Sequence, residues 1–86
     1  MKVSLKKQKE YRQRLVAFFK EQGFTVVLGK GSFHQGTCLV QQDKKIVING
    51  FLPVDMQVKF LVETAEAQHQ SDKVPDEIIK FGKSVG

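Results

Sequence analysis

The stretch Ile46–His69 (IVINGFLPVDMQVKFLVETAEAQH) decides the fold of this chain. It begins with β-branched residues that favour a strand, and Asn49-Gly50 ends that strand. Pro53 then suits the first turn of a helix, because its missing N–H has no helical partner at that position. Asp55 in the same turn complements the positive end of the helix dipole. The stretch therefore predicts a strand, a turn and a helix that runs to about its last residue.

The apolar residues of this predicted helix recur every three or four positions, so they share one face. The stripe consists of Val54, Val58, Leu61 and Ala65, with Val62 beside it. Such a stripe is typical of a helix that packs on other elements of a core. Together with apolar residues of the other predicted elements, it gives the expected core: Leu15, Phe18, Phe19, Val26, Leu28, Leu39, Ile46, Ile48, Val58, Leu61, Val62 and Ala65.

Residues 5–22 predict an amphipathic helix near the N-terminus. Its apolar face on the helical wheel carries Tyr11, Leu15, Phe18 and Phe19. Gly23 follows as a residue that commonly ends a helix.

Three short runs of β-branched and aromatic residues predict strands over residues 24–28, 37–41 and 45–49. Gln42-Asp43-Lys44 predicts a tight hairpin turn between the last two strands. Those two strands are therefore expected to pair antiparallel.

A last short helix is predicted from Pro75 to Phe81, with Gly82 as its stop. The expected order is helix, three strands, helix, helix. Helices segregated from strands favour an α+β fold. We expect an N-terminal helix, a three-stranded largely antiparallel sheet, a central helix and a short C-terminal helix, all in one domain spanning residues 1–86.

The composition restricts the classes of protein that fit. No run approaches the ~20 apolar residues that a membrane span needs, so no membrane partner is expected. The basic N-terminus is not followed by the apolar core of a signal peptide. The single cysteine, Cys38, cannot form an internal disulfide. These features predict a cytoplasmic protein.

The net charge of +5 is concentrated in the first predicted helix. Lys6, Lys9 and Lys20 fall on the side of the helical wheel opposite the apolar face, and Gln13 joins them. They are candidates for contacts with an anionic partner such as the phosphates of a nucleic acid. The alternative is a helix face that is merely solvated.

The glycine-rich segment Gly29–Gly36 (GKGSFHQG) is expected to be a loop. It is not a phosphate-binding P-loop, because it lacks the required spacing and leads into a strand. Phe33 and His34 are candidates for a binding surface, since loops often carry function. A plain connector between two strands is the alternative.

The end of the central helix, Ala65-Glu66-Ala67-Gln68-His69, matches the zinc-peptidase pattern HExxH except at its first ligand position. Alanine cannot ligate zinc, and this one belongs to the apolar stripe. The remaining weak candidates for metal ligands are Glu66, His69, His34 and Cys38. Nothing in the sequence brings them together, so no metal, cofactor or catalytic residue is predicted.

Three segments resemble a family of small uncharacterised bacterial proteins over roughly residues 23–82. They are Gly36-Thr37-Cys38, the run Ile-Val-Ile-Asn-x-x-Leu-Pro from Ile46 to Pro53, and Val74–Ile79 (VPDEII). The strand, turn and helix are also distantly similar to the core of repressor-cleaving phage-immunity-type zinc metallopeptidases. Without an intact HExxH, this likeness implies a fold and carries over neither zinc nor peptidase activity.

The lack of a complete catalytic set favours a protein that is not an enzyme. The leading hypothesis is a bacterial domain that acts through protein–protein contacts, including a homo-oligomer formed through a sheet edge. The alternatives are a basic nucleic-acid-binding module and a cryptic or degenerate zinc metallopeptidase-like domain.

Overall fold

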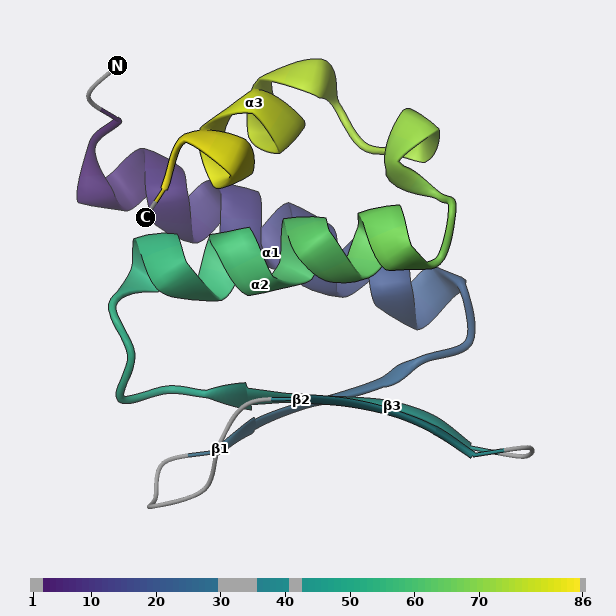
Figure 1. Ribbon diagram of the computed structural model, residues 1–86. Helices are drawn as coiled ribbons and strands as arrows, with labels where there is room; N and C mark the ends of the chain where they lie inside the picture. Colours follow the sequence, from purple (N-terminus) through teal and green to yellow (C-terminus); the bar gives the residue numbers. More distant parts are fainter. Residues whose placement is uncertain (1–2, 30–35, 41–42, 86) are drawn as a thin grey trace.

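The computed structural model describes residues 3–29, 36–40 and 43–85, with the backbone alone for residues 36–40 and 43. The elements in chain order are α1 (Leu5–Glu21), β1 (Thr25–Gly29), β2 (Gly36–Val40), β3 (Asp43–Asn49), α2 (Val54–Ala67), the 3-10 turn η1 (Ser71–Lys73) and α3 (Asp76–Ser84). The helices all lie on one side of the strands (Figure 1), and the α+β class is confirmed. None of the helices in this described part is long and apolar enough to cross a membrane.

The pairing of the strands differs from the prediction. The strand order is β1-β3-β2, and β3 pairs in parallel with β1 and antiparallel with β2. The prediction of a three-stranded, largely antiparallel sheet is therefore wrong, because the β1–β3 pair is parallel. The chain reverses direction twice between β1 and β3, so these strands run the same way once they become neighbours. A hairpin turn in the sequence does not specify on which side of the hairpin the first strand lies.

The β2–β3 hairpin also turns earlier than predicted. Val40 pairs with Asp43, and β3 continues from Asp43 through Lys44. The prediction that Asp43 and Lys44 belong to the turn is therefore wrong, and Gln42 lies outside the described residues. Asp and Lys are depleted in strands, so this charged pair indicated a turn, although Lys44 lies exposed within β3.

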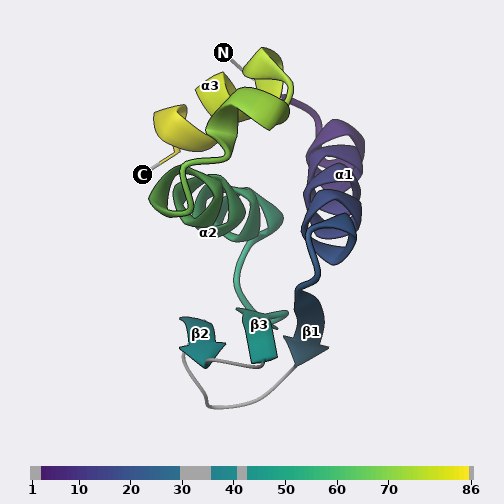
Figure 2. The same cartoon turned by 90° about the vertical axis from the view of Figure 1, so that its right-hand side faces the viewer.

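The two faces of the β1–β3 pair have different surroundings. Val26 and Leu28 are in register with Ile46 and Ile48, and register partners in a parallel pair place their side chains on the same face. Ile46 and Ile48 are fully buried, on the face that α1 and α2 cover (Figure 2). Val27 belongs to the opposite face, over which no described helix lies.

The core lies between the sheet and the helices α1 and α2, and it continues among the three helices. Most of the predicted core is confirmed as buried: Leu15, Phe19, Ile46, Ile48, Val58, Leu61, Val62 and Ala65. Phe18 and Val26 are partly buried against this cluster. Leu28 is 52% exposed, so its assignment to the core is wrong. The side chain of Leu39 lies outside the described part.

The end of α1 fixes the path into β1. Gly23 has a φ of 91°, the left-handed conformation that favours glycine, and its N–H donates to the carbonyl of Lys20 at 3.1 Å. The next N–H, of Phe24, donates to the carbonyl of Phe19 at 2.9 Å, and the two rings pack edge to face at 5.2 Å. This is a Schellman motif with its apolar contact. The predicted stop of the helix at Gly23 is confirmed.

The buried side chain of Gln57 connects α1 to the turn between β3 and α2. Its Nε2 donates to the carbonyl of Leu52 at 2.8 Å, and its Oε1 accepts from the Arg12 guanidinium at 2.9 Å. A buried amide with both ends bonded holds its neighbours in place, because loss of either bond leaves a desolvated polar group. The exit of β3 is therefore held against α1.

The last helix, α3, does not stop at Gly82 as predicted but continues to Ser84. Gly82 is buried against α2, and a Cβ built at this position would lie 2.5 Å from Cγ2 of Val62. The glycine is needed for the close approach of α3 to α2 and not for a turn.

Candidate functional site

His69 has a structural role at the end of α2. Its φ is 56°, the left-handed region, and its N–H donates to the carbonyl of Glu66 at 3.0 Å. The N–H of Gln70 then donates to the carbonyl of Ala65 at 2.9 Å. These two bonds form a second Schellman motif, with histidine in the position that glycine usually occupies. The residue that resembled the second zinc ligand of HExxH therefore terminates the helix.

The glutamate of the degenerate motif is engaged with α3. Glu66 Oε2 lies 2.8 Å from Nζ of Lys83, and this hydrogen bond, followed by the carboxylate charge, raises the pKa of Lys83 above its usual value. Ala65 is fully buried in the core. Among the described residues, no three His, Cys, Asp or Glu side chains are close enough to hold a metal ion.

The other weak metal candidates and the loop candidates are not placed by the structure. His34 and Phe33 lie outside the described residues, and for Cys38 only the backbone, in β2, is described. Their roles stay predictions from the sequence.

The basic candidates on α1 are accessible. Lys6, Lys9 and Lys20 are all exposed, and none forms an ion pair with another described residue. Lys7, by contrast, lies 4.0 Å from Glu10. The predicted separation between the basic side and the apolar face of the helix is confirmed by the burial of Tyr11.

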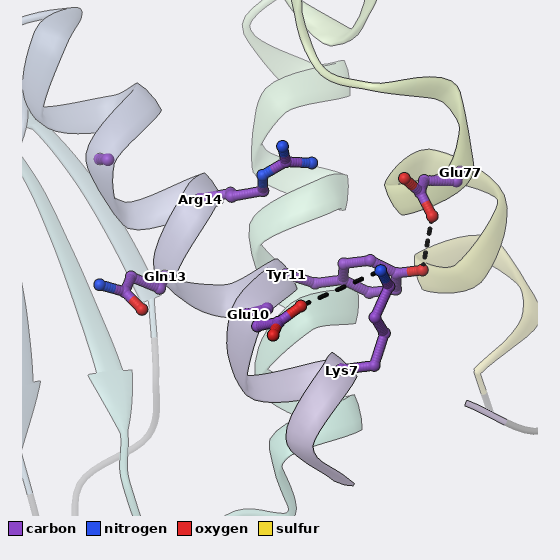
Figure 3. Close-up of a pocket in the computed structure, with 7 residues that line it drawn as sticks. Lys7, Glu10, Tyr11, Gln13, Arg14 and Glu77 are labelled. Carbon is purple, nitrogen blue, oxygen red and sulfur yellow. Dashed lines mark hydrogen bonds and ion pairs between the residues drawn. The ribbon is translucent and has the colours of Figure 1, made fainter. Parts of the chain in front are cut away.

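A shallow pocket of about 470 Å³ lies between α1 and α3 (Figure 3). Its lining combines opposite charges around one aromatic ring: Lys7, Glu10, Tyr11, Gln13, Arg14, Ala17 and Glu77. The phenol of Tyr11 points at Glu77 and donates to its Oε2 at 2.9 Å. Burial first, and then the bond to Glu77, raises the pKa of Tyr11. A phenol that is both engaged as a donor and harder to ionise is a poor general base, so the contact serves to join the helices.

The edge strand β1 carries two exposed large apolar side chains. Its sequence, Thr25–Gly29 (TVVLG), holds no charged residue and no proline. Val27 is 38% exposed and Leu28 is 52% exposed. Figure 2 shows β1 at the margin of the sheet, with α1 above it and no described element beside it.

The hydrogen bond between Gly50 and Gly29 determines which backbone groups of β1 face outward. The N–H of Gly50 donates to the carbonyl of Gly29, at 2.6 Å, next to the register pair Gly29–Asn49. Backbone groups in a strand alternate in direction, so the N–H and carbonyl groups of Gly29 and Val27 point toward β3. The N–H and carbonyl groups of Val26 and Leu28 therefore point away from the sheet.

A further exposed apolar side chain lies at the same end of the sheet. Phe51 is 68% exposed and directly follows Gly50, while Leu28 directly precedes the Gly29 to which Gly50 is bonded. The N–H of Phe51 is held by Oδ1 of Asn49 at 3.0 Å, which fixes the start of the turn. Phe51 thus adds an exposed apolar side chain just beyond the end of β3, one residue from the bond to β1.

The sequence alone did not identify this edge. Alternation of apolar residues indicates a strand, but an edge strand and a central strand of a small sheet show the same pattern. One signal was present, since the run Phe24–Gly29 has no charge although natural sheet edges usually carry one.

The comparisons with known proteins give no family for this chain. No family model matches it, and neither a curated protein nor a solved structure matches it. The likeness to small bacterial proteins and to zinc metallopeptidases stays an expectation from the sequence.

Proposed function

We propose that this protein is a non-enzymatic domain that binds another protein chain along the outer edge of β1. One observation carries the proposal: an uncharged, partly exposed strand lies at the edge of the sheet with the backbone groups of Val26 and Leu28 directed outward.

Sheet edges are normally protected in proteins. An open edge is a row of unpaired donors and acceptors, and proteins usually block it with lysine, proline, a bulge or a covering loop. Neither a charge nor a proline protects β1, and Val27 and Leu28 offer apolar contacts on the two faces of the strand. Addition of a partner strand would satisfy the backbone groups and cover these side chains.

The test uses a photo-reactive phenylalanine analogue at Phe51, the exposed residue after the Gly50 that is bonded to the end of β1, and at Glu63, an exposed position on α2. We expect cross-linked adducts from the first position that are absent from the second. Leu28→Lys, which puts a charge on the edge, should abolish the adducts. Ala67→Lys adds the same charge at an exposed position of α2 and should leave them unchanged. Equal adducts from both positions, or adducts that survive Leu28→Lys, contradict the proposal.

A second candidate is binding of nucleic acid on the basic side of α1, because Lys6, Lys9 and Lys20 are exposed without an ion-pair partner in the described chain. Fluorescence anisotropy with labelled DNA and RNA should then show affinity that falls steeply as salt rises. Lys6→Gln with Lys9→Gln should weaken binding, whereas Lys80→Gln should not, since Lys80 already pairs with Asp76 at 3.1 Å. No binding at low ionic strength removes this candidate.

A further inference from the structure

We propose that the chain bound at β1 is a second copy of this protein, paired antiparallel with the two-fold axis passing by Val27. This inference rests on the proposed function and names its partner.

The alternation of backbone directions along β1 supports a symmetric pair of strands. The outward backbone groups belong to Val26 and Leu28, which stand one residue on either side of Val27. In an antiparallel pair centred on Val27, Val26 lies opposite the partner's Leu28, and Leu28 lies opposite the partner's Val26. Each of these is a hydrogen-bonded pair that exchanges both N–H···O bonds. All outward donors and acceptors of the two residues are satisfied.

The neighbouring registers are less favourable. An axis at Val26 places Leu28 opposite the partner's Phe24, and the N–H of Phe24 is already used in the bond to Phe19. An axis at Leu28 places Val26 opposite a position beyond Gly29, where β1 ends. Centring on Val27 is therefore the register in which the outward N–H and carbonyl groups of the two copies of β1 bond to each other.

The side chains fit the same register. Val27 meets the partner's Val27 on the uncovered face, in the non-hydrogen-bonded type of pair where side chains approach most closely. Leu28, which is 52% exposed, gains an apolar neighbour on the face of the helices. No charged residue lies in Thr25–Gly29, so the two-fold axis brings no like charges together within the paired strands.

The register can be tested with engineered cysteines in a Cys38→Ser background, which removes the native thiol. In a non-hydrogen-bonded antiparallel pair the Cα atoms lie about 4.5 Å apart, within the roughly 4.4–6.8 Å that a disulfide allows. Val27→Cys should therefore form a covalent dimer under mild oxidation. Thr25→Cys is the matched control on the same face, because its Cα is about 13 Å from its symmetry mate along the strands.

Association itself is measured by sedimentation equilibrium of the 9.8 kDa chain in the native sequence. We expect a concentration-dependent dimer that Leu28→Lys weakens by about tenfold or more, with Ala67→Lys unchanged. Circular dichroism of both variants checks that each is folded. If Leu28→Lys does not fold, Leu28→Ala, which adds no charge, serves as a second edge variant.

The outcomes separate this inference from the proposed function. A Val27→Cys dimer without a Thr25→Cys dimer, together with self-adducts from Phe51, supports the inference. Equal cross-linking of both cysteines, or a monomer at all concentrations, overturns it. If Phe51 then cross-links to a different protein and Leu28→Lys prevents this, the proposed function stands without the second copy. If Phe51 gives no edge-dependent adduct, both fail.

Discussion

His69 shows how one residue can resemble a ligand and serve as a helix terminus. Its position in the sequence fits HExxH, yet its backbone adopts the left-handed conformation and its N–H closes the last turn of α2. Histidine is among the non-glycine residues that tolerate this region. The sequence correctly predicts that this residue ends the helix. The spacing of apolar residues, however, carries no information about the φ angle of a single residue.

We expect His69→Gly to stabilise the protein. Relief of left-handed strain is worth about 1–2 kcal/mol, and the added freedom of glycine in the unfolded chain costs about 0.4–1 kcal/mol. The net gain in the free energy of unfolding should lie between about 0 and 1.6 kcal/mol by urea denaturation. His69→Ala keeps a Cβ and should give no gain. A loss of stability in His69→Gly would contradict the assigned role.

The pKa shifts of Tyr11 and Lys83 predict weaker folding at high pH. Both groups have their pKa raised above the usual values of 10.0 for tyrosine and 10.5 for lysine, so each holds its proton more tightly in the folded state. Their contribution is complete below the unfolded value and is lost as pH rises through the folded value. The free energy of unfolding should therefore begin to fall near pH 10, and Tyr11→Phe should flatten this fall. A pH profile that is identical in Tyr11→Phe and the native protein would contradict the assignment.

At the scale of elements, the sequence specified segments better than pairings. The helices over 5–22 and 53–69 were predicted to within two residues at each end, because capping and periodicity are local. The partner of β1 was not predictable, since pairing depends on the path of the chain through space. Leu28 was assigned to the core for the same reason, as its burial depends on whether a helix reaches over the edge.

The α2–α3 contact gives a prediction at this scale. Gly82→Ala places a methyl group within 2.5 Å of Cγ2 of Val62 and should destabilise the protein. Overpacking costs about 1–3 kcal/mol, which exceeds the gain in helix propensity of about 1 kcal/mol at most.

The control for Gly82→Ala is a double variant. Adding Val62→Ala removes Cγ2 and Cγ1, although Cβ stays 2.7 Å from the new methyl group, so the double variant should be less destabilised than the sum of the two single changes. Additive effects, measured by urea denaturation, would show that the clash does not occur.

At the scale of the whole molecule, the net charge of +5 opposes self-association. Added salt screens this repulsion, with a Debye length of about 10 Å at 0.1 M. The dissociation constant of the dimer should therefore fall as salt rises. Binding of nucleic acid to the basic side of α1 would show the opposite dependence. Sedimentation equilibrium at low and high salt measures how the dimer depends on salt. A dimer that weakens as salt rises would contradict the uncharged β1 interface.

The central claim is that the outer edge of β1 pairs with a second chain, and amide hydrogen exchange of single residues by NMR tests it most directly. The N–H of Val27 faces β3 and should be protected at every protein concentration. The N–H groups of Val26 and Leu28 face outward and should exchange quickly in dilute protein, then become protected as the concentration rises. Fast exchange of Val26 and Leu28 at all concentrations would contradict the account.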